Sequence, residues 1–324
     1  MQPWRRLLRV TLAFWILAGP TQRAAAAEAP DGKPWDTPRV LRMMQAGRRT
    51  VYAGVQRIEM SHGPRTTETT ARVAQLEGWT RTEFLSPDRM RGMVVLERGG
   101  QRLVRLSGRR KWSQRPGSEP SRSRLLARNY RLTETGRAQV AGRPVVVVDI
   151  QHRQLRKTAR RLWMDVETGV ALRTELRDWT GKVVGTTELG EIDYTPQLEK
   201  SAFVVPPGDI VRHPPVEPPP GAETIPLHPA FLPPGYVPAG PHRWVRMDRG
   251  TAAHLRFTDG LKAISLFVRR LNPDEKPLPE RDPQREGRRP SFSGVVRVTK
   301  GDCRITAMGD APPGILAQIA ESLE

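Results

Sequence analysis

The sequence predicts an α+β protein with a large antiparallel sheet and a few helices on one face, followed by a smaller α+β domain. The first supporting observation is a long series of segments in which apolar and polar residues alternate, with turn residues at short intervals between them. The second is the lack of a regular strand–helix alternation, which argues against a parallel sheet. The third is a proline-rich stretch, 206–227, that separates two such series.

The first 27 residues have the pattern of a secretory signal peptide. Arg5, Arg6 and Arg9 precede an uncharged apolar run of nine residues at 10–18, and the small residues at 24–27 offer a cleavage site. Such a run is too short to cross a hydrocarbon core of about 30 Å as a helix. We therefore expect cleavage near Ala27 and a mature chain that is soluble outside the cytoplasm. The alternative is an uncleaved membrane anchor.

Charge is the strongest compositional feature. The chain has 53 Lys and Arg against 34 Asp and Glu, and the signal segment holds four arginines and no acids, so the mature chain carries 49 − 34 = +15. In a cytosolic protein this charge would indicate that nucleic acid is the binding partner. Export instead favours anionic lipid head groups, lipopolysaccharide phosphates or acidic protein segments, and we expect no nucleic-acid partner. The alternative is an arginine-rich proteome that produces the charge without a specific partner.

The first domain is expected over 33–205. Thr37 followed by Pro38 indicates an N-cap and a first helical turn, and the apolar residues that follow predict a helix over 38–46. A second helix at 123–129 is expected over the sheet. The alternating segments predict strands at 51–60, 69–76, 79–85, 90–97, 101–106, 130–134, 140–149, 160–165, 172–178 and 183–192.

The stretch 206–227 is expected to be a stiff linker, because it carries eight prolines and few large apolar residues. The second domain is expected over 228–324. Its predicted elements are a strand at 245–247, a hairpin of 253–258 and 262–269 about Asp259-Gly260, a hairpin of 295–299 and 303–308 about Lys300-Gly301, and a helix at 315–323.

Motifs that would carry catalysis are missing. The six histidines stand singly, without the spacing that presents two imidazoles to zinc, and no G-x-S-x-G elbow occurs. The only cysteine, Cys303, excludes an intramolecular disulfide and is expected to be a small core residue. Glu188, Glu191 and Asp193 cluster on one predicted strand, which gives a weak basis for a hydrolase with paired carboxylates. We expect no enzyme activity, no metal and no cofactor.

Aromatic and methionine residues of the first sheet are the candidate ligand-binding groups. If they lie on the inner face of a curved sheet, they could enclose a lipid-sized apolar cavity. The alternative is a filled core beneath the helices. The five candidates are Trp79, Phe84, Met93, Trp112 and Trp163.

A run of basic residues is the densest candidate for an anionic partner in the first domain. The alternative is a solvated strand or loop edge. The run consists of Arg153, Arg156, Lys157, Arg160 and Arg161.

Several segments resemble the RseB/MucB family. In the first domain these are RRTVYAGVQRIEM at 48–60, YRLTETGRAQVAGRPVVVVDI at 130–150 and RRLWMDVETGVALRTELRDWTGKVVGTTELGEIDY at 160–194. In the second domain they are FLPPGYVPAG at 231–240 and AHLRFTDGLKAISLFV at 253–268. Their succession after a signal peptide is more specific than any one of them alone.

The resemblance implies a first domain with the half-barrel fold of the carriers LolA and LolB, and a periplasmic regulator. Such proteins bind the exported domain of an anti-sigma factor and are released by a lipid or lipopolysaccharide-like signal. The alternative is a lipid or lipoprotein carrier without a dedicated partner. This chain is richer in Arg and Pro in its loops than the family pattern, so no family binding residue is carried over. Self-association is left open.

Overall fold

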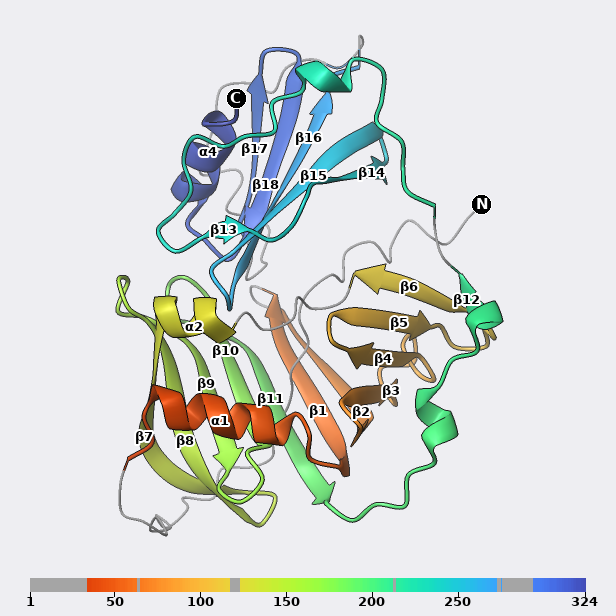
Figure 1. Cartoon of the computed structure of the whole chain (residues 1–324), viewed down its shortest axis with the longest axis vertical. Coiled ribbons are helices and arrows are strands. Elements are labelled where there is room, and N and C mark those ends of the chain that lie inside the picture. The colour runs from red at the N-terminus through yellow and green to blue at the C-terminus, as the bar shows by residue number, and fades with distance from the viewer. Residues whose placement is uncertain (1–33, 63–64, 117–122, 212–213, 273–274, 276–293) are drawn as a thin grey trace.

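A computed structural model describes residues 34–62, 65–116, 123–211, 214–272, 275 and 294–324, and the predicted cleavage near Ala27 lies outside these ranges. Two separate sheets form the body of the protein, a large one from the first part of the chain and a smaller one from the second (Figure 1). This architecture confirms the predicted α+β class, with a large, open, curved antiparallel sheet and a smaller second sheet.

The first helix, α1 (Thr37–Gly47), begins one residue earlier than the sequence indicates. Asp36, not Thr37, is the N-cap, because its Oδ1 accepts the backbone N–H of Arg39 at 2.9 Å. Thr37 instead forms hydrogen bonds to a strand of the large sheet. Its hydroxyl donates to the carbonyl of Leu132 and accepts the N–H of the same residue. This pair of bonds ties the start of α1 to the large sheet.

The large sheet has twelve strands in the order β12-β6-β5-β4-β3-β2-β1-β11-β10-β9-β8-β7. Neighbouring strands pair antiparallel except for β12 and β6, which are parallel. The strands are β1 (Tyr52–His62), β2 (Arg65–Leu76), β3 (Trp79–Phe84), β4 (Val94–Arg98), β5 (Gln101–Arg105), β6 (Trp112–Pro116), β7 (Tyr130–Val140), β8 (Arg143–His152), β9 (Thr158–Asp165), β10 (Ala171–Arg177), β11 (Val183–Asp193) and β12 (Ile210–Val211).

Two predicted strands are wrong at their starts. The strand expected at 90–97 begins only at Val94, because Met90 to Met93 lie in a turn closed by the bond from the N–H of Met93 to the carbonyl of Met90. The other is the strand expected at 140–149. The structure has a hairpin there, in which β7 runs on to Val140 and β8 begins at Arg143. Ala141 and Gly142 form the turn with positive φ values of 50° and 71°. A type I′ hairpin turn requires positive φ values at two consecutive residues. Gly142 is a residue type that favours such a turn, whereas alanine rarely takes a positive φ.

The two faces of the large sheet differ in what covers them. We call the face beneath α1 and α2 (Ser123–Asn129) the helix face, and the opposite one the outer face (Figure 1). Over β7 to β9 the helix face forms a closed apolar core with the two helices. That core contains Trp35, Val40, Leu126, Tyr130, Leu132, Val146, Val148, Ile150, Ala159, Leu162 and Met164. The helices therefore fill this half of the sheet rather than leave it open.

The chain after β11 returns along the outer face of the other half. Residues 198–210 cover β3 to β6 there, with Phe203 buried against Leu96, Leu103 and Trp112. The stretch expected as a linker then contributes the edge strand β12, which pairs with β6. Further along it, Ile225 packs into the core of the second domain. The proline-rich stretch is thus anchored at both ends by apolar side chains.

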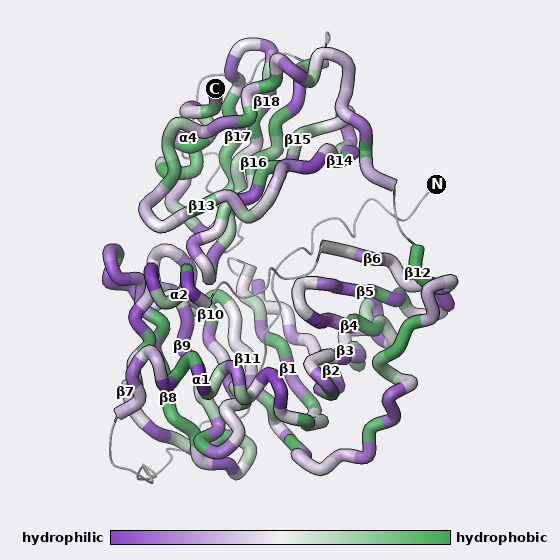
Figure 2. The backbone as a smooth tube through the Cα atoms, viewed as in Figure 1, coloured by the Kyte–Doolittle hydropathy of each residue, from purple (hydrophilic) through white to green (hydrophobic). Residues whose placement is uncertain are grey.

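The second sheet packs against one helix. Its order is β13-β15-β16-β18-β17, with β14 also paired to β15. The elements are β13 (Val237–Pro238), β14 (Arg243–Met247), β15 (Gly250–Thr258), β16 (Ala263–Arg270), β17 (Gly294–Lys300), β18 (Cys303–Gly309) and α4 (Pro313–Glu321). Figure 2 shows α4 and the adjacent strands as largely hydrophobic. Cys303 is buried in this core.

None of the described helices is both long enough and apolar enough to span a bilayer.

Candidate functional site

Two of the five candidate cavity residues lie together on the helix face. Phe84 of β3 is buried in a cluster against which Met93 packs. The same cluster contains Ile58, Met60 and Ala71, with Met90, Val95 and Leu176 packed around it. It lies beside the core that α1 and α2 cover. Methionine adapts to apolar partners of varied shape, and three methionines, Met60, Met90 and Met93, help to fill this small apolar core.

The three candidate tryptophans lie on the other side of the sheet. Trp79 and Trp112 belong to the outer-face cluster that residues 198–210 cover, and each carries an arginine over its ring, Arg98 and Arg105. Trp163 lies in register with Val147 and Arg173, whose guanidinium stacks 4.7 Å from its ring centre. Strand alternation sends these side chains away from the helix face, so the five candidates form no single cavity.

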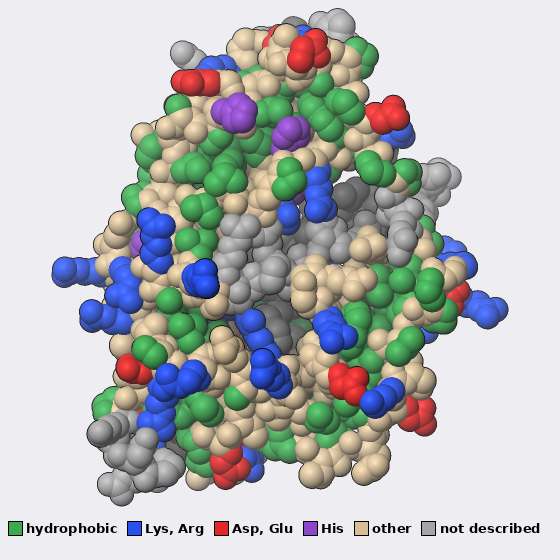
Figure 3. Space-filling view, in the orientation of Figure 1, with side chains coloured by type: hydrophobic (Ala, Val, Ile, Leu, Met, Phe, Trp, Pro, Cys, Tyr) green, Lys and Arg blue, Asp and Glu red, His purple; other side chains and the backbone are tan. Residues whose placement is uncertain are grey.

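The basic run also divides between surfaces. Arg153, Arg156 and Lys157 are exposed around the turn from β8 to β9. Arg161 lies on the outer face and forms a bidentate pair with Asp149 at 2.6 and 3.0 Å. Arg160, on the alternate side of β9, lies on the helix face between Ile150 and Leu176. In the view of Figure 3, Lys and Arg are spread over the first domain rather than gathered in one patch.

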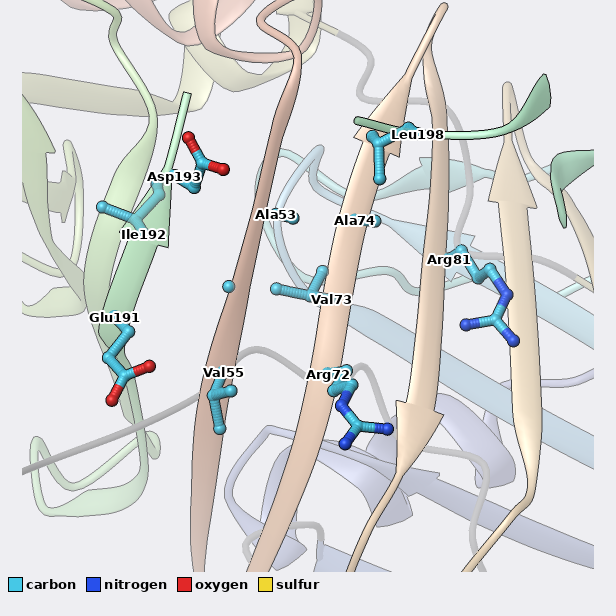
Figure 4. Close-up of a pocket in the computed structure, with 11 residues that line it drawn as sticks. Ala53, Val55, Arg72, Val73, Ala74, Arg81, Glu191, Ile192, Asp193 and Leu198 are labelled. Atoms are coloured by element: carbon cyan, nitrogen blue, oxygen red, sulfur yellow. The ribbon is translucent and has the colours of Figure 1, made fainter. Parts of the chain in front are cut away.

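A hollow of about 560 Å³ opens on the large sheet between β11, β1 and β2 (Figure 4). Its floor contains the small residues Ala53, Gly54 and Ala74, and Leu198 overhangs one side. Gly54 is needed where β1 and β11 approach closely, because a Cβ there would lie 2.4 Å from the carbonyl oxygen of Glu191.

Charges of opposite sign stand on the two sides of this hollow. Arg72 and Arg81 extend from β2 and β3, and Glu191 and Asp193 from β11 (Figure 4). Asp193 is engaged in a turn, since its Oδ1 accepts the backbone N–H and the hydroxyl of Thr195. Glu188, the third residue of the carboxylate cluster, pairs with Arg173 at 2.8 Å. Two of the three carboxylates therefore have structural partners.

The two domains meet at the turn between β15 and β16, which rests on α2 (Figure 1). Asp259 in this turn is 1% exposed, and its Oδ2 accepts the hydroxyl of Tyr130 at 2.5 Å. Its Oδ1 accepts the backbone N–H groups of Leu261 and Lys262 at 2.9 and 2.7 Å. One carboxylate thus shapes the turn and binds it to the first domain.

Two glycines bring the domain backbones into contact. A Cβ on Gly260, at φ 99°, would lie 2.6 Å from the backbone nitrogen of Leu126 in α2. A Cβ on Gly235, at φ 88°, would lie 2.8 Å from the amide of Asn129. Asn129 in turn donates from Nδ2 to the carbonyls of Gly235 and Asp259 at 2.9 and 2.8 Å. The junction is closely packed, and its polar groups are hydrogen-bonded.

Burial sets the electrostatics of this junction. It raises the pKa of Tyr130, and the charge and hydrogen bond of Asp259 raise it further. Burial likewise raises the pKa of Tyr236, with the charges of Asp259 and Asp310 adding to the effect. The ring of His152 stands edge-on to Tyr130 at 5.1 Å, and burial lowers its pKa. All three side chains are therefore neutral at pH 7, which suits a buried junction.

The sequence indicates the Asp259-Gly260 turn but not its partners. Tyr130 and Asp259 are 129 positions apart, and nothing local marks their contact. Among the residues that the structure describes, no three His, Cys, Asp or Glu side chains come together as metal ligands would.

The chain belongs to the MucB/RseB family, because 42–206 match the model of the MucB/RseB N-terminal domain and 223–324 that of the MucB/RseB C-terminal domain. This confirms the resemblance found in the sequence.

Similar proteins include regulators of sigma factors. The sigma factor AlgU regulatory protein MucB of Pseudomonas aeruginosa is 24% identical over 97% of each chain. The sigma-E factor regulatory protein RseB of Salmonella typhimurium is 24% identical over 61% of this chain and 60% of its own. The structure of the P. aeruginosa MucA/MucB complex has a similar fold, with a TM-score of 0.60 and 18% identity over 89% of this chain and 98% of the other.

Proposed function

We propose that the protein is a periplasmic regulator that binds the exported domain of an anti-sigma factor. The observation that carries this proposal is the match of both family domains, in order, over most of the chain. MucB of P. aeruginosa, which is similar to this chain over 97% of its length, is a sigma-factor regulatory protein. A fold neighbour is MucB in complex with MucA(peri), at a TM-score of 0.59. The signal-peptide pattern of the first 27 residues supports export.

The regulator senses a lipid or lipopolysaccharide-like signal through the helix face of the first domain. The cluster of Phe84, Met60 and Met93 supports this part of the proposal, since it gathers adaptable apolar side chains on the sheet next to the two helices. This cluster contains two of the five residues, Phe84 and Met93, that the sequence suggested as the lining of one cavity. The exposed Arg153, Arg156 and Lys157 are the part of the basic run available to an acidic partner.

Binding to a defined partner tests the regulatory role. The mature chain is mixed with the purified exported domain of a single-span anti-sigma factor from the same genome, and binding is measured by calorimetry. We expect saturable binding that protects the anti-sigma domain from limited proteolysis. A control uses the exported domain of an unrelated single-span protein, and equal behaviour of the two domains would contradict the proposal.

A carrier of lipids or lipoproteins is the second candidate, favoured by the same methionine-rich cluster. The two functions differ in their need for a protein partner. Native mass spectrometry of the chain purified from envelope extracts separates them. Acyl adducts without any binding of anti-sigma domains favour the carrier, whereas binding of the anti-sigma domain that acyl ligands weaken favours the regulator.

A further inference from the structure

β17 is an edge strand of the second sheet, because β18 pairs with it on one side and no described strand pairs with it on the other (Figure 1). The β17–β18 hairpin has a two-residue turn, Gly301-Asp302, so the residues that flank the turn are hydrogen-bonded to each other. Every second residue back from Lys300 therefore bonds to β18 through its backbone. The backbone groups of the residues between them point away from the sheet, and no described backbone group bonds to them. These residues are Val295, Arg297 and Thr299.

The other edges of the two sheets are protected against pairing with a further strand. On β7, the carbonyl of Trp35 accepts the N–H of Glu134 at 3.1 Å, and the Thr37 hydroxyl binds both backbone groups of Leu132. A bulge follows between Glu134 and Gly136. β12 and β13 have only two residues each, and β14 carries two exposed arginines among its five residues. Edge strands that are covered, bulged, short or charged resist the addition of another strand.

Within the described chain, β17 has none of these protections. Its seven residues pair with β18 without a register shift and include no proline. Four of them are valine or threonine, which are residue types with high β propensity. Of its two charged residues, Lys300 donates from Nζ to the carbonyl of Glu321 at the end of α4. Arg297 is the charged side chain that remains exposed, and it forms no ion pair with a described residue.

The side chains of β17 determine which residues an added strand would carry. Val296 belongs to the core beneath α4, and Val298 is partly buried and packs against that core. Arg297 points to the opposite side of the sheet, because side chains alternate along a strand. Neighbouring strands place their side chains in contact pairs. An added strand is therefore stabilised by apolar side chains beside the two valines and by an acidic side chain beside Arg297.

A second copy of this chain is a poor occupant of this edge. Antiparallel pairing of two β17 strands about their centre places Arg297 of one copy opposite Arg297 of the other. Like charges directly opposite each other destabilise a strand pair. Charge complementarity therefore favours a segment with an acidic residue at this position.

We propose that the free edge of β17 binds an extended segment of the anti-sigma factor's exported domain, in which an acidic residue lies between two apolar residues. The segment adds a strand to the second sheet through hydrogen bonds to the outward backbone groups of β17. These bonds supply affinity, and Arg297 and the two valines select the side chains. This inference rests on the proposed regulatory function and assigns the surface and the mode of binding.

The test measures, by calorimetry, the binding of mature-chain variants to the exported domain of a single-span anti-sigma factor from the same genome. Arg297→Pro removes an outward N–H that makes no bond to β18, and edge strands tolerate proline at such positions. Arg246→Pro is the matched control at the opposite edge of the same sheet. The two-residue turn between Met247 and Gly250 gives Arg246 an outward N–H by the same count. Arg297→Gln removes the charge and keeps the N–H.

We expect the wild type and Arg246→Pro to bind with equal affinity, and Arg297→Pro to bind at least 10-fold more weakly. Arg297→Gln should bind about 2- to 5-fold more weakly than the wild type. Hydrogen exchange of the wild type gives a second readout. Binding should protect the outward amides of Arg297 and Thr299, whereas β18 already protects those of Val296 and Val298.

The outcomes separate this binding mode from the regulatory function itself. If Arg297→Pro is folded by its melting temperature and binds like the wild type, or if the outward amides gain no protection, β17 is not the binding edge and the regulatory function stands. If Arg297→Pro does not fold, the exchange measurement and Arg297→Gln decide. If the wild type binds no anti-sigma domain, the regulatory function fails, and the role of β17 fails with it. A wild-type dimer that Arg297→Pro dissociates would assign the edge to a second copy and contradict the proposal.

Discussion

At the scale of single residues, the junction between the domains depends on groups whose hydrogen bonds are completed only by the other domain. Without the opposite domain, Oδ2 of Asp259 would lose the Tyr130 hydroxyl, and the Asn129 amide would lose its two carbonyl acceptors. Each such hydrogen bond contributes about 0.5–1.5 kcal/mol net, because separated domains expose these groups to water instead. These residues therefore favour the docked arrangement over separated domains.

Tyr130→Phe should loosen the junction. The change removes one hydrogen bond and leaves Oδ2 of Asp259 buried, so we expect a loss of about 1–3 kcal/mol in stability and faster proteolysis between the domains. Tyr194→Phe is the control, because the described partners of the Tyr194 hydroxyl, Asp165 and Thr168, belong to the first domain. Equal proteolysis of the two variants between the domains would contradict this role of Tyr130.

His254 should make the stability of the second domain depend on pH. Its ring stacks on Phe267 at 4.3 Å, and burial, followed by the charges of Arg256 and Arg243, lowers its pKa to about 4. An unfolded histidine has a pKa of about 6.5. Protonation thus favours the unfolded chain, and the stability is fully present above about pH 6.5 and is lost as the pH falls through 4.

His254→Gln should flatten this dependence. Denaturation midpoints at pH 7, 5.5 and 4 measure it, with His242→Gln at an exposed histidine of the same domain as the control. We expect the wild type and the control to lose about 2–3 kcal/mol over this range beyond any loss in His254→Gln. An equal slope in all three proteins would show that His254 does not carry the effect.

At the scale of elements, the sequence predicts helices and turns that depend on neighbouring residues, and it misses contacts between elements that are distant in the chain. The helix at 123–129 and the turns at 259–260 and 300–301 are predictable because capping, periodicity and turn residues are short-range signals. The strand predicted at 140–149 begins too early because Ala141 adopts a positive φ that its residue type does not indicate. The sequence could not predict that the tryptophans lie away from the helices. Alternation tells which side chains share a face of the sheet, but not which face the helices cover.

Gly260→Ala tests the contact between the β15–β16 turn and α2. The new methyl group would meet Leu126, so we expect the domains to separate and the chain to expand in small-angle scattering. Gly250→Ala is the matched control. Gly250 has a similar φ of 117°, but a Cβ at this position would have no heavy atom within 4 Å. Both variants incur a backbone cost of about 1–2 kcal/mol, so only the difference between them reports the domain contact.

At the scale of the whole molecule, the two domains act as one docked unit rather than as two modules on a free linker. Residues 207–211 join the first sheet and Ile225 joins the second core, so the proline-rich stretch is held at both ends. The proline content of the sequence indicates two domains, but the junction joins residues more than 100 positions apart. Such contacts leave no periodic or local pattern.

The docked arrangement gives the proposed regulator a route between its ligand and its partner. The helix face carries the methionine-rich cluster, and the second domain rests on the same α2 that borders this face. A ligand that shifts α2 or Tyr130 would change the support of the second domain. We therefore expect acyl ligands and the anti-sigma domain to influence each other's affinity, as linkage requires.

The most direct test of the central claim is the equilibrium binding of the mature chain to the exported domain of a single-span anti-sigma factor from the same genome, measured by calorimetry. The account predicts saturable binding with a dissociation constant below about 10 μM, and weaker binding by Gly260→Ala than by Gly250→Ala. No binding by folded wild-type protein, with no protection of the anti-sigma domain from proteolysis, would contradict it.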